Sequence, residues 1–303
     1  MRRAHAFDPW QDMRRPDFEL HFKRDVCLDK VELHHHDFYE IYFLMSGDVT
    51  YTIESRLCHV MPGDLLLISP RELHQIRIQA ELAAYERYVL WLAPHMLDRL
   101  STDQTDLRRC FGEEQIACGN LLKLRPEDRT LAQSLFQRLW QETGETGYGA
   151  ELMGTCLLTE LLVLINRLAD QKDSRTEART NQAVSQAVDY IHLHYGEPLS
   201  LSMLADRFYV SKYHLSHEFN RQIGTSVHRY ILKKRLLISR QMLAQGKAPG
   251  DIAGDCGFGD YTGFYRAFRA EYGLSPREYA QSVKQKTAEH AELGMRQQAL
   301  FEK

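Results

Sequence analysis

Two stretches in the last third of the chain repeat one pattern of small and apolar residues. In each, a short helical segment that contains an alanine leads through a tight turn into a second helical segment. The second segments carry apolar residues four positions apart, Leu215 and Phe219 in one copy, Phe264 and Phe268 in the other. Residues four apart share one face of a helix, so each second segment has a single buried stripe. The repeat predicts two helix-turn-helix units within Leu199–Tyr279.

The opposite faces of these second segments carry side chains that donate or accept hydrogen bonds. We expect both second segments to be helices whose first turns are capped by the side-chain oxygens of Ser211 and Asp260. Such faces suit the DNA major groove, which admits one helix and exposes donors and acceptors on the base edges. The candidate DNA-binding residues are Lys212, Tyr213, His214, Ser216, His217 and Arg221 in the first helix, and Tyr261, Thr262, Tyr265 and Arg266 in the second.

One long helix is expected between the two units. From Val227 to Leu243 the sequence has no Gly or Pro, leucine or serine recurs at helical spacing, and Gly246 follows as a helix end. A rigid connector fixes the separation of the two second segments, so that both can reach one face of a duplex about one turn (~34 Å) apart. The cationic run Lys233-Lys234-Arg235 has two open interpretations, contact with phosphate or a solvated face.

A longer set of residues matches one known pattern. These residues are Ala205, Ser211, Leu215, Phe219, Gly224, Tyr230 and Arg235 in the first unit, and Ile252, Ala253, Gly257, Phe258, Asp260, Phe264, Arg266, Phe268, Gly273, Ser275, Pro276 and Tyr279 in the second. The pattern resembles the AraC/XylS family of bacterial transcription regulators. The resemblance implies sequence-specific binding to double-stranded DNA through two recognition helices, Ser211–Arg221 and Asp260–Ala270. His217 and Asn220 depart from it, because the family usually has Arg and Lys there.

The charge distribution agrees with this function better than the total charge does. The formal net charge of the 303 residues is −3, which alone argues against nucleic acid. By contrast, residues 183–282 carry about 12 Lys and Arg against about 9 Asp and Glu. The excess is modest, so affinity must depend on specific contacts, on dimerisation, or on both.

The cysteines and the apolar segments indicate a cytoplasmic protein. The six cysteines contain no Cys-x-x-Cys pair, which favours reduced thiols, with a Cys110–Cys118 redox pair as the alternative. The amino terminus has no apolar run behind its two arginines, so we expect no secretory signal. The longest apolar stretch, Leu157–Ile165, is too short to span a bilayer, and we expect no membrane contact.

The first third of the chain has the pattern of a small β-barrel. From Val31 to Leu92, short alternating or apolar runs are separated by turn residues such as Ser46-Gly47-Asp48 and Pro62-Gly63-Asp64. Within this region, His34-x-His36, Glu40 and Gly47 resemble the first cupin motif in every spacing. The segment from Pro62-Gly63-Asp64 to Pro70 and His74 resembles the second cupin motif, with the histidine one residue closer to the proline than in metal-binding enzymes.

Two interpretations of this polar group remain open. In the first, the residues line a pocket for a small polar effector, such as a sugar, and satisfy one another by hydrogen bonds; Tyr42 and Trp91 would stack on the ligand. In the second, the donors hold a divalent transition metal, as in an enzyme. The resemblance favours the first, with no cofactor and no catalysis; a metal-dependent cupin enzyme fused to a DNA-binding domain is the alternative. The effector candidates are His34, His36, Glu40, Tyr42, His74 and Trp91, and the metal candidates are His34, His36, Glu40 and His74.

The expected architecture is therefore α+β: a cupin-like barrel with flanking helices, followed by an all-α domain of two helix-turn-helix units joined by a long helix. The predicted divisions are an arm and barrel at 1–95, a helical dimerisation segment at 96–170, a linker at 171–182, the DNA-binding domain at 183–282 and a tail at 283–303. The apolar stripe within Glu151–Ala169 packs either inside the chain or at a two-fold dimer interface, and the resemblance favours a homodimer. RNA polymerase is a further partner if the protein is an activator.

Overall fold

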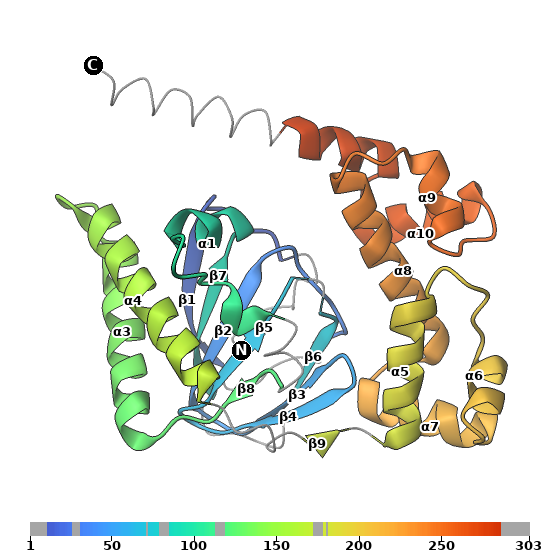
Figure 1. Ribbon diagram of the computed structural model, residues 1–303, viewed down its shortest axis with the longest axis horizontal. Helices are drawn as coiled ribbons and strands as arrows, with labels where there is room; N and C mark the ends of the chain where they lie inside the picture. The colour runs from blue at the N-terminus through green and yellow to red at the C-terminus, as the bar shows by residue number, and fades with distance from the viewer. Residues whose placement is uncertain are drawn as a thin grey trace, which may run out of the picture. The chain divides into compact units, whose positions relative to one another are not determined.

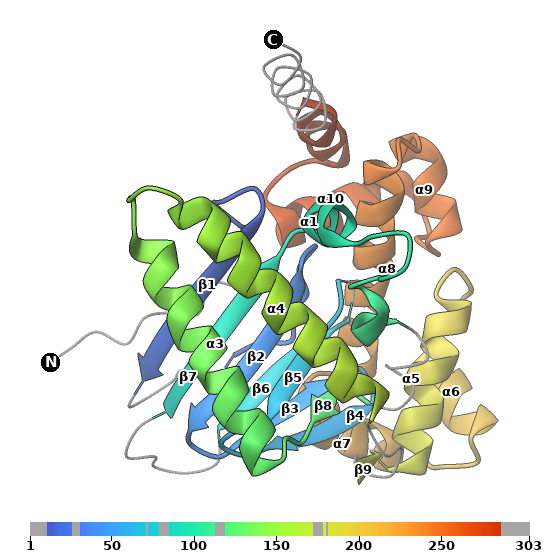
Figure 2. The same ribbon diagram turned by 60° about the vertical axis from the view of Figure 1, so that its left-hand side comes forward.

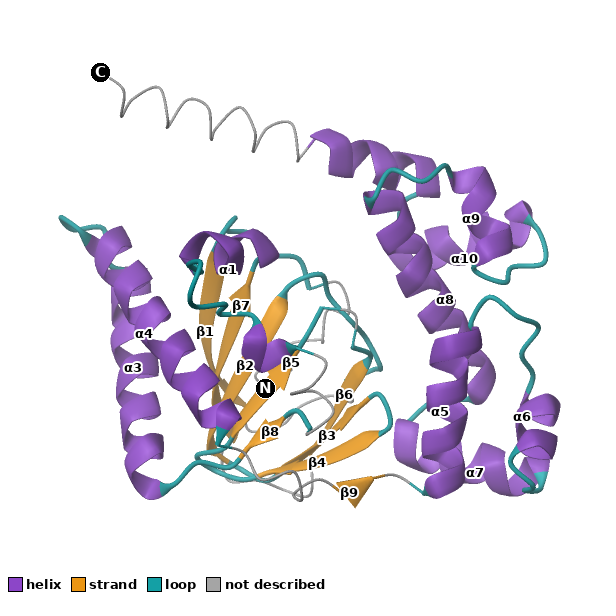
Figure 3. Ribbon diagram, in the orientation of Figure 1, coloured by secondary structure: helices purple, strands orange, loops and turns teal. Residues whose placement is uncertain are grey.

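The computed structural model describes residues 11–25, 31–70, 72–78, 85–112, 119–171, 178–179 and 181–285 (Figure 1). The chain divides near residue 185 into two compact units. In the described residues the first unit combines strands with helices, and the second is helical (Figure 3). This is the α+β arrangement expected from the sequence.

Two antiparallel sheets form the described part of the barrel. Their strand orders are β1-β7-β2-β5-β8 and β6-β3-β4-β9. The strands are β1 (Phe18–Asp25), β2 (Tyr39–Ser46), β3 (Val49–Ile53), β4 (Arg56–Val60), β5 (Leu65–Ile68), β6 (His74–Ile78), β7 (Tyr85–Leu92), β8 (Leu121–Leu122) and β9 (Ala178–Arg179). The β-like runs predicted between Val31 and Leu92 correspond to β2–β7.

Strand β2 shows how the first sheet is packed on both faces. Successive side chains of a strand point to opposite faces. Ile41 and Phe43 therefore belong to a core shared with the helices, and Tyr42 and Leu44 to a core within the barrel. Glu40 has the same parity as Tyr42, so the strand period turns this carboxylate to the barrel interior.

Two long helices, α3 (Pro126–Gly144) and α4 (Ala150–Asp170), lie side by side over the first sheet (Figure 2). The apolar stripe of α4 is fully buried in their shared core at Leu158, Leu161, Leu162 and Ile165. For this stripe, packing inside the chain is the correct interpretation, and no dimer is needed to cover it. The rest of the segment predicted as mostly helical contains α1 (Pro94–Leu100), the 3₁₀ turn Arg109–Phe111 and the short strand β8.

By length and composition, α4 is long and apolar enough to cross a membrane, and no other described helix meets that test. It extends well beyond the apolar stretch Leu157–Ile165 singled out from the sequence. Of its most apolar window 39% is buried, and the core of the first unit accounts for that part of the composition.

The second unit contains α5 (Gln182–His194), α6 (Leu201–Arg207), α7 (Lys212–Ile223), α8 (Val227–Ala244), α9 (Pro249–Asp255) and α10 (Tyr261–Tyr272). The long connecting helix predicted from Val227 is thus confirmed as α8. In the first helix-turn-helix, Phe219 of α7 packs edge-on against Tyr230 of α8, with ring centroids 5.5 Å apart. In the second, Leu236 and Leu243 of α8 share a core with Ile252, Phe264 and Phe268.

The structure gives two members of the cationic run on α8, Lys233 and Arg235, partners within the chain. The Lys233 ammonium donates to the Glu271 carboxylate at 2.6 Å, and Lys233 is only 8% exposed. The Arg235 guanidinium donates to the carbonyl oxygens of Tyr195 and Glu197 at 2.8 and 2.6 Å. These contacts tie α8 to α10 and to the segment after α5, so both cations stabilise the fold, and for Lys233 the interpretation as a solvated face is wrong.

Several predicted segments lie partly outside the described residues. Of the predicted linker, Ala178 and Arg179 form β9, which pairs antiparallel with β4. The arm is described from residue 11 and the tail only to residue 285. Cys118 of the alternative Cys110–Cys118 pair also lies outside the described residues, and Cys110 is buried.

Candidate functional site

The two recognition helices, α7 and α10, begin at capped amino termini. The Ser211 hydroxyl oxygen accepts a hydrogen bond from the His214 backbone N–H at 3.1 Å. The Asp260 carboxylate accepts one from the Gly263 backbone N–H at 2.6 Å. Both residues were predicted as N-caps, and both caps are confirmed. Each cap satisfies a backbone donor that the first helical turn leaves without an intrahelical partner.

The structure exposes nearly all of the residues predicted to contact DNA. The exposed ones are Lys212, Tyr213, His214, Ser216, His217 and Arg221 on α7, and Tyr261, Thr262 and Arg266 on α10. Tyr265 is half-buried, and its hydroxyl accepts a hydrogen bond from the Arg269 guanidinium at 3.2 Å. Phe258, predicted as core, is half-buried and packs against Phe264 with ring centroids 5.1 Å apart.

Arg269 is an exposed cation that the sequence analysis missed. It lies three residues after Arg266, so the two side chains share one face of α10. That spacing was available in the sequence and could have identified it. The fully exposed residues of α7 and α10 include no Asp or Glu. Each helix has one half-buried carboxylate, Glu218 of α7 and Glu271 of α10, and Glu271 is paired with Lys233. The fully exposed side chains of both helices are therefore neutral or cationic, which favours contact with a polyanion.

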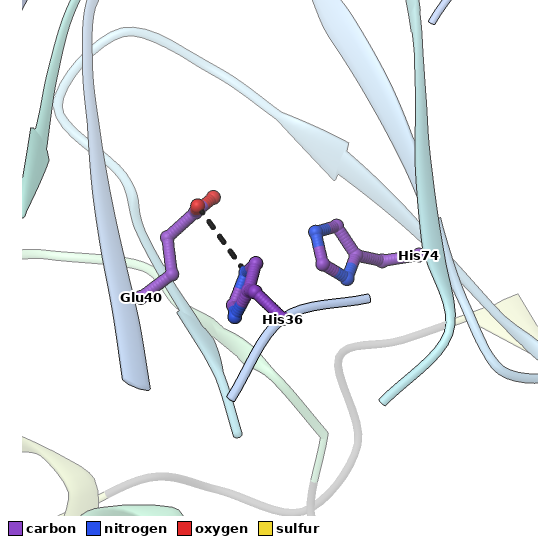
Figure 4. A group of neighbouring side chains, drawn as sticks. All are labelled: His36, Glu40 and His74. Atoms are coloured by element: carbon purple, nitrogen blue, oxygen red, sulfur yellow. Dashed lines mark ion pairs between the residues drawn. The ribbon is translucent and has the colours of Figure 1, made fainter. Parts of the chain in front are cut away.

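A second group of functional side chains converges inside the barrel. His36 and Glu40 come from the entry to β2, and His74 begins β6 (Figure 4). Their ligand atoms all lie within 4.8 Å of one another, and the three side chains are buried. The His36 Nε2 atom lies 3.4 Å from the Glu40 carboxylate, which also accepts a hydrogen bond from the Trp91 indole at 3.0 Å.

Burial and neighbouring charge shift the proton affinities of this group. Burial of Glu40 opposes its ionisation, but His36, together with His74 and Lys23, lowers the pKa of Glu40 to about 2. Burial and the adjacent His36 lower the pKa of His74 to about 4. At neutral pH the barrel therefore holds an ionised carboxylate beside an uncharged His74 ring.

His34 does not join this group. Its backbone pairs with that of His74 in an isolated bridge, with the two N–H···O distances at 3.0 and 2.9 Å. The prediction that His34, His36 and Glu40 share one face of a regular strand is therefore wrong, because β2 begins only at Tyr39. His34 remains a neighbour of the group, since its ring centroid lies 4.2 Å from that of His74.

Tyr42 and Trp91 face the barrel interior, as a pocket requires, but both are already packed. The Tyr42 hydroxyl lies 2.5 Å from the Tyr85 hydroxyl, and Trp91 packs against Phe38 with ring centroids 4.7 Å apart. The prediction missed Tyr85 and Arg87, which line the same interior; the Arg87 guanidinium lies 4.0 Å above the Tyr85 ring. Alternation along β7 could have found them, since both share parity with Trp91.

These two sites define a class of protein: a ligand-binding barrel joined to a DNA-binding domain of two helix-turn-helix units. Known families agree with that division. The family model described as an AraC-like ligand binding domain matches residues 16–162, and the one described as a helix-turn-helix domain matches residues 204–282. The chain belongs to the AraC family of transcription regulators.

Individual relatives extend over most of the chain. The HTH-type transcriptional activator RhaS of Citrobacter koseri is 26% identical over 257 residues, covering 82% of this chain and 87% of the relative. RhaS of Escherichia fergusonii is 27% identical over 253 residues with the same coverage. Among solved structures, fatty-acid-bound ToxT of Vibrio cholerae covers 89% of this chain and 97% of its own at 12% identity, with a TM-score of 0.38.

Proposed function

We propose that α7 and α10 read DNA sequence and that the barrel controls this reading in response to a small polar effector. The observation that carries the proposal is the pair of capped helices, each with a buried stripe and with no Asp or Glu among its fully exposed residues. Arg266 is the strongest candidate for a guanine, because a guanidinium can donate to O6 and N7 together. Lys212 and Arg221, near the ends of α7, suit phosphate.

The barrel interior supports a small polar ligand such as a sugar. Aromatic rings supply apolar faces at Tyr42 and Trp91, and Glu40, His34, His36 and His74 supply donors and acceptors. All six side chains are less than 9% exposed, so entry of an effector requires some of them to move. An effector can alter DNA binding only if its affinity differs between the two arrangements of the protein.

This role requires action on chromosomal DNA in the cytoplasm, without catalysis. The RhaS relatives are named transcriptional activators, which supports activation here as well. Activation would make RNA polymerase a further partner of the protein.

Selection from random-sequence DNA tests the two-helix reading. If α7 and α10 both enter the major groove from one connector, the enriched sequences should contain two short conserved blocks about 10 base pairs apart. High-throughput sequencing of the bound pool measures the spacing. A pool with one block would remove one helix from the proposal, and a pool with no enrichment would contradict sequence-specific binding altogether.

A homodimer is the second part of the proposal, on a different face from the one first predicted. A groove of about 450 Å³ is formed by side chains of α3 and α4. It is lined by Leu131, Leu135, Thr155, Cys156, Thr159, Glu160, Val163, Leu164 and Arg167. Glu160 and Arg167 lie two helical turns apart on α4, so a two-fold axis between them would set each against the opposite charge of a second copy. The groove thus suits self-association.

Replacing Leu131 by glutamate tests this surface. Leu131 is 45% exposed, so the fold should survive, whereas a carboxylate at an apolar interface should weaken dimerisation by at least ~10-fold. Analytical ultracentrifugation measures the dimer, and Leu193→Glu, at a position 79% exposed on α5, is the matched control. Equal self-association of both variants and the wild type would reject the groove. The exposed thiol of Cys156 gives a second measurement, since its alkylation should slow on dimerisation.

A further inference from the structure

The inference concerns the atoms of His36, Glu40 and His74 that face one another inside the barrel. His36 Nδ1 lies 2.8 Å from the Phe38 carbonyl oxygen, and His74 Nδ1 lies 2.9 Å from the Glu72 carbonyl oxygen. A carbonyl oxygen can only accept, so each Nδ1 carries a proton. In a neutral ring, the other nitrogen then presents a lone pair. Backbone contacts of this kind fix the ring orientation and tautomer of metal-binding histidines.

The inward nitrogens make no hydrogen bond with the described residues. The Nε2 atoms of both His36 and His74 are buried without such a partner. The separation of 3.4 Å between His36 Nε2 and the Glu40 carboxylate exceeds the ~2.7–2.9 Å of a charge-assisted hydrogen bond. The expectation that these groups satisfy one another by hydrogen bonds is therefore wrong for both nitrogens. When both rings are neutral, two nitrogen lone pairs and a carboxylate share a site that a cation would satisfy.

We propose that His36, Glu40 and His74 bind a divalent transition metal ion through the two Nε2 atoms and one carboxylate oxygen. With metal–ligand distances of ~2.1 Å, neighbouring ligands of a tetrahedral ion lie roughly 3.4 Å apart. The His36–Glu40 pair already has this separation, at 3.4 Å. All three ligand atoms lie within 4.8 Å of one another, so only a small inward movement of His74 is needed to bring it into the same coordination shell.

The donor set determines which ions fit. Imidazole nitrogen suits zinc, iron, cobalt and nickel, whereas calcium and magnesium prefer sites built from oxygen. Three protein ligands leave at least one coordination position for water or for an oxygen of a polar effector. The inference thus deepens the proposed function, and it rests on that function only where it gives the ion a part in effector binding.

Metal binding can be measured on the full-length protein without a histidine tag. The metal-free protein is titrated with Zn²⁺ and with Co²⁺, whose visible absorption reports its ligands. The test variants are Glu40→Gln and His74→Gln; the control is His59→Gln, an exposed histidine on β4. We expect one ion per chain and a melting temperature raised by about 5–10 °C at 100 times the dissociation constant. Each test variant should lose at least ~100-fold in affinity, since even outer-shell changes cost about 10–100-fold.

Two results would overturn the proposal. One is a wild-type protein that shows neither a visible Co²⁺ spectrum nor a thermal shift, which needs no variant to interpret. The other is a folded Glu40→Gln variant that binds Zn²⁺ as tightly as His59→Gln does; the pair would then be an imidazolium–carboxylate contact. DNA affinity of the same samples keeps the two proposals apart: intact DNA binding without metal binding rejects the metal site alone.

Discussion

The double substitution His217→Ala/Arg266→Ala is expected to abolish most sequence-specific DNA binding. Each helix loses one exposed reader, and a good base contact contributes about 1–3 kcal/mol, so the pair should cost about 2–6 kcal/mol. That corresponds to a loss on the order of 10¹–10⁴-fold in affinity. Electrophoretic mobility shift on the DNA selected by the wild-type protein measures it. The two positions lie on different helices, so their effects should be close to additive.

A charge-matched control separates reading from general attraction. Arg277→Ala removes one exposed cation outside α7 and α10 and should weaken specific and non-specific binding equally. The double variant should instead lower the ratio of specific to non-specific affinity. Specific binding at the wild-type level in the double variant would show that His217 and Arg266 do not contact bases. The remaining candidates for base contact would then be Tyr213, Thr262 and Arg269.

Phe268→Ala should produce the largest loss of stability in the second helix-turn-helix. The side chain is completely buried and lies against Phe264, Tyr272 and Tyr279, with ring centroids 5.6, 4.5 and 5.8 Å away. Truncation of such a residue leaves a cavity that its rigid neighbours cannot fill, at a cost of about 3–5 kcal/mol. Chemical denaturation followed by circular dichroism should show an earlier transition for the helical unit.

Tyr213→Ala provides the matching aromatic control. Tyr213 is 81% exposed on α7, so its truncation should change the free energy of unfolding by less than ~0.5 kcal/mol. The sequence pattern gives the same order, since Phe268 belongs to the buried stripe of α10 and Tyr213 to the exposed face of α7. Similar stability of the two variants would mean that the Phe268 environment repacks, and that the described core is not rigid.

The helical unit could be predicted closely because its signals are local. Caps at Ser211 and Asp260 and stripes four residues apart depend on neighbours within one or two turns. The cationic run on α8 shows where this reasoning stops. The partner of Lys233 is Glu271, on another helix, and the partners of Arg235 are backbone carbonyls. Charge alone predicts solvent or phosphate, and only the packed structure supplies these other partners.

The barrel was harder to predict because its site is assembled from separate strands. The spacing of His36 and Glu40 identified two members, and the cupin resemblance suggested His74. The break in strand geometry before Tyr39 was not visible in the sequence, and it removes His34 from the group. Backbone carbonyls accept the hydrogen bonds that orient His36 and His74. Every residue carries a carbonyl, so residue types could not predict these contacts.

Strand β2 has two packed faces, one in the barrel interior and one against the helices, and a change on one face affects the other. The backbone that carries Glu40 and Tyr42 inward also carries Ile41 and Phe43 outward, and the Phe43 ring stacks on Phe136 of α3 at a centroid distance of 5.1 Å. If the inner side chains are displaced, the backbone that they share with the outer side chains moves, and the packing of Phe43 against α3 changes. Thermodynamic reciprocity then requires any effect of a bound ligand on self-association to be matched by an equal effect of self-association on ligand affinity. Ligand affinity measured across protein concentration would give that coupling in a single experiment.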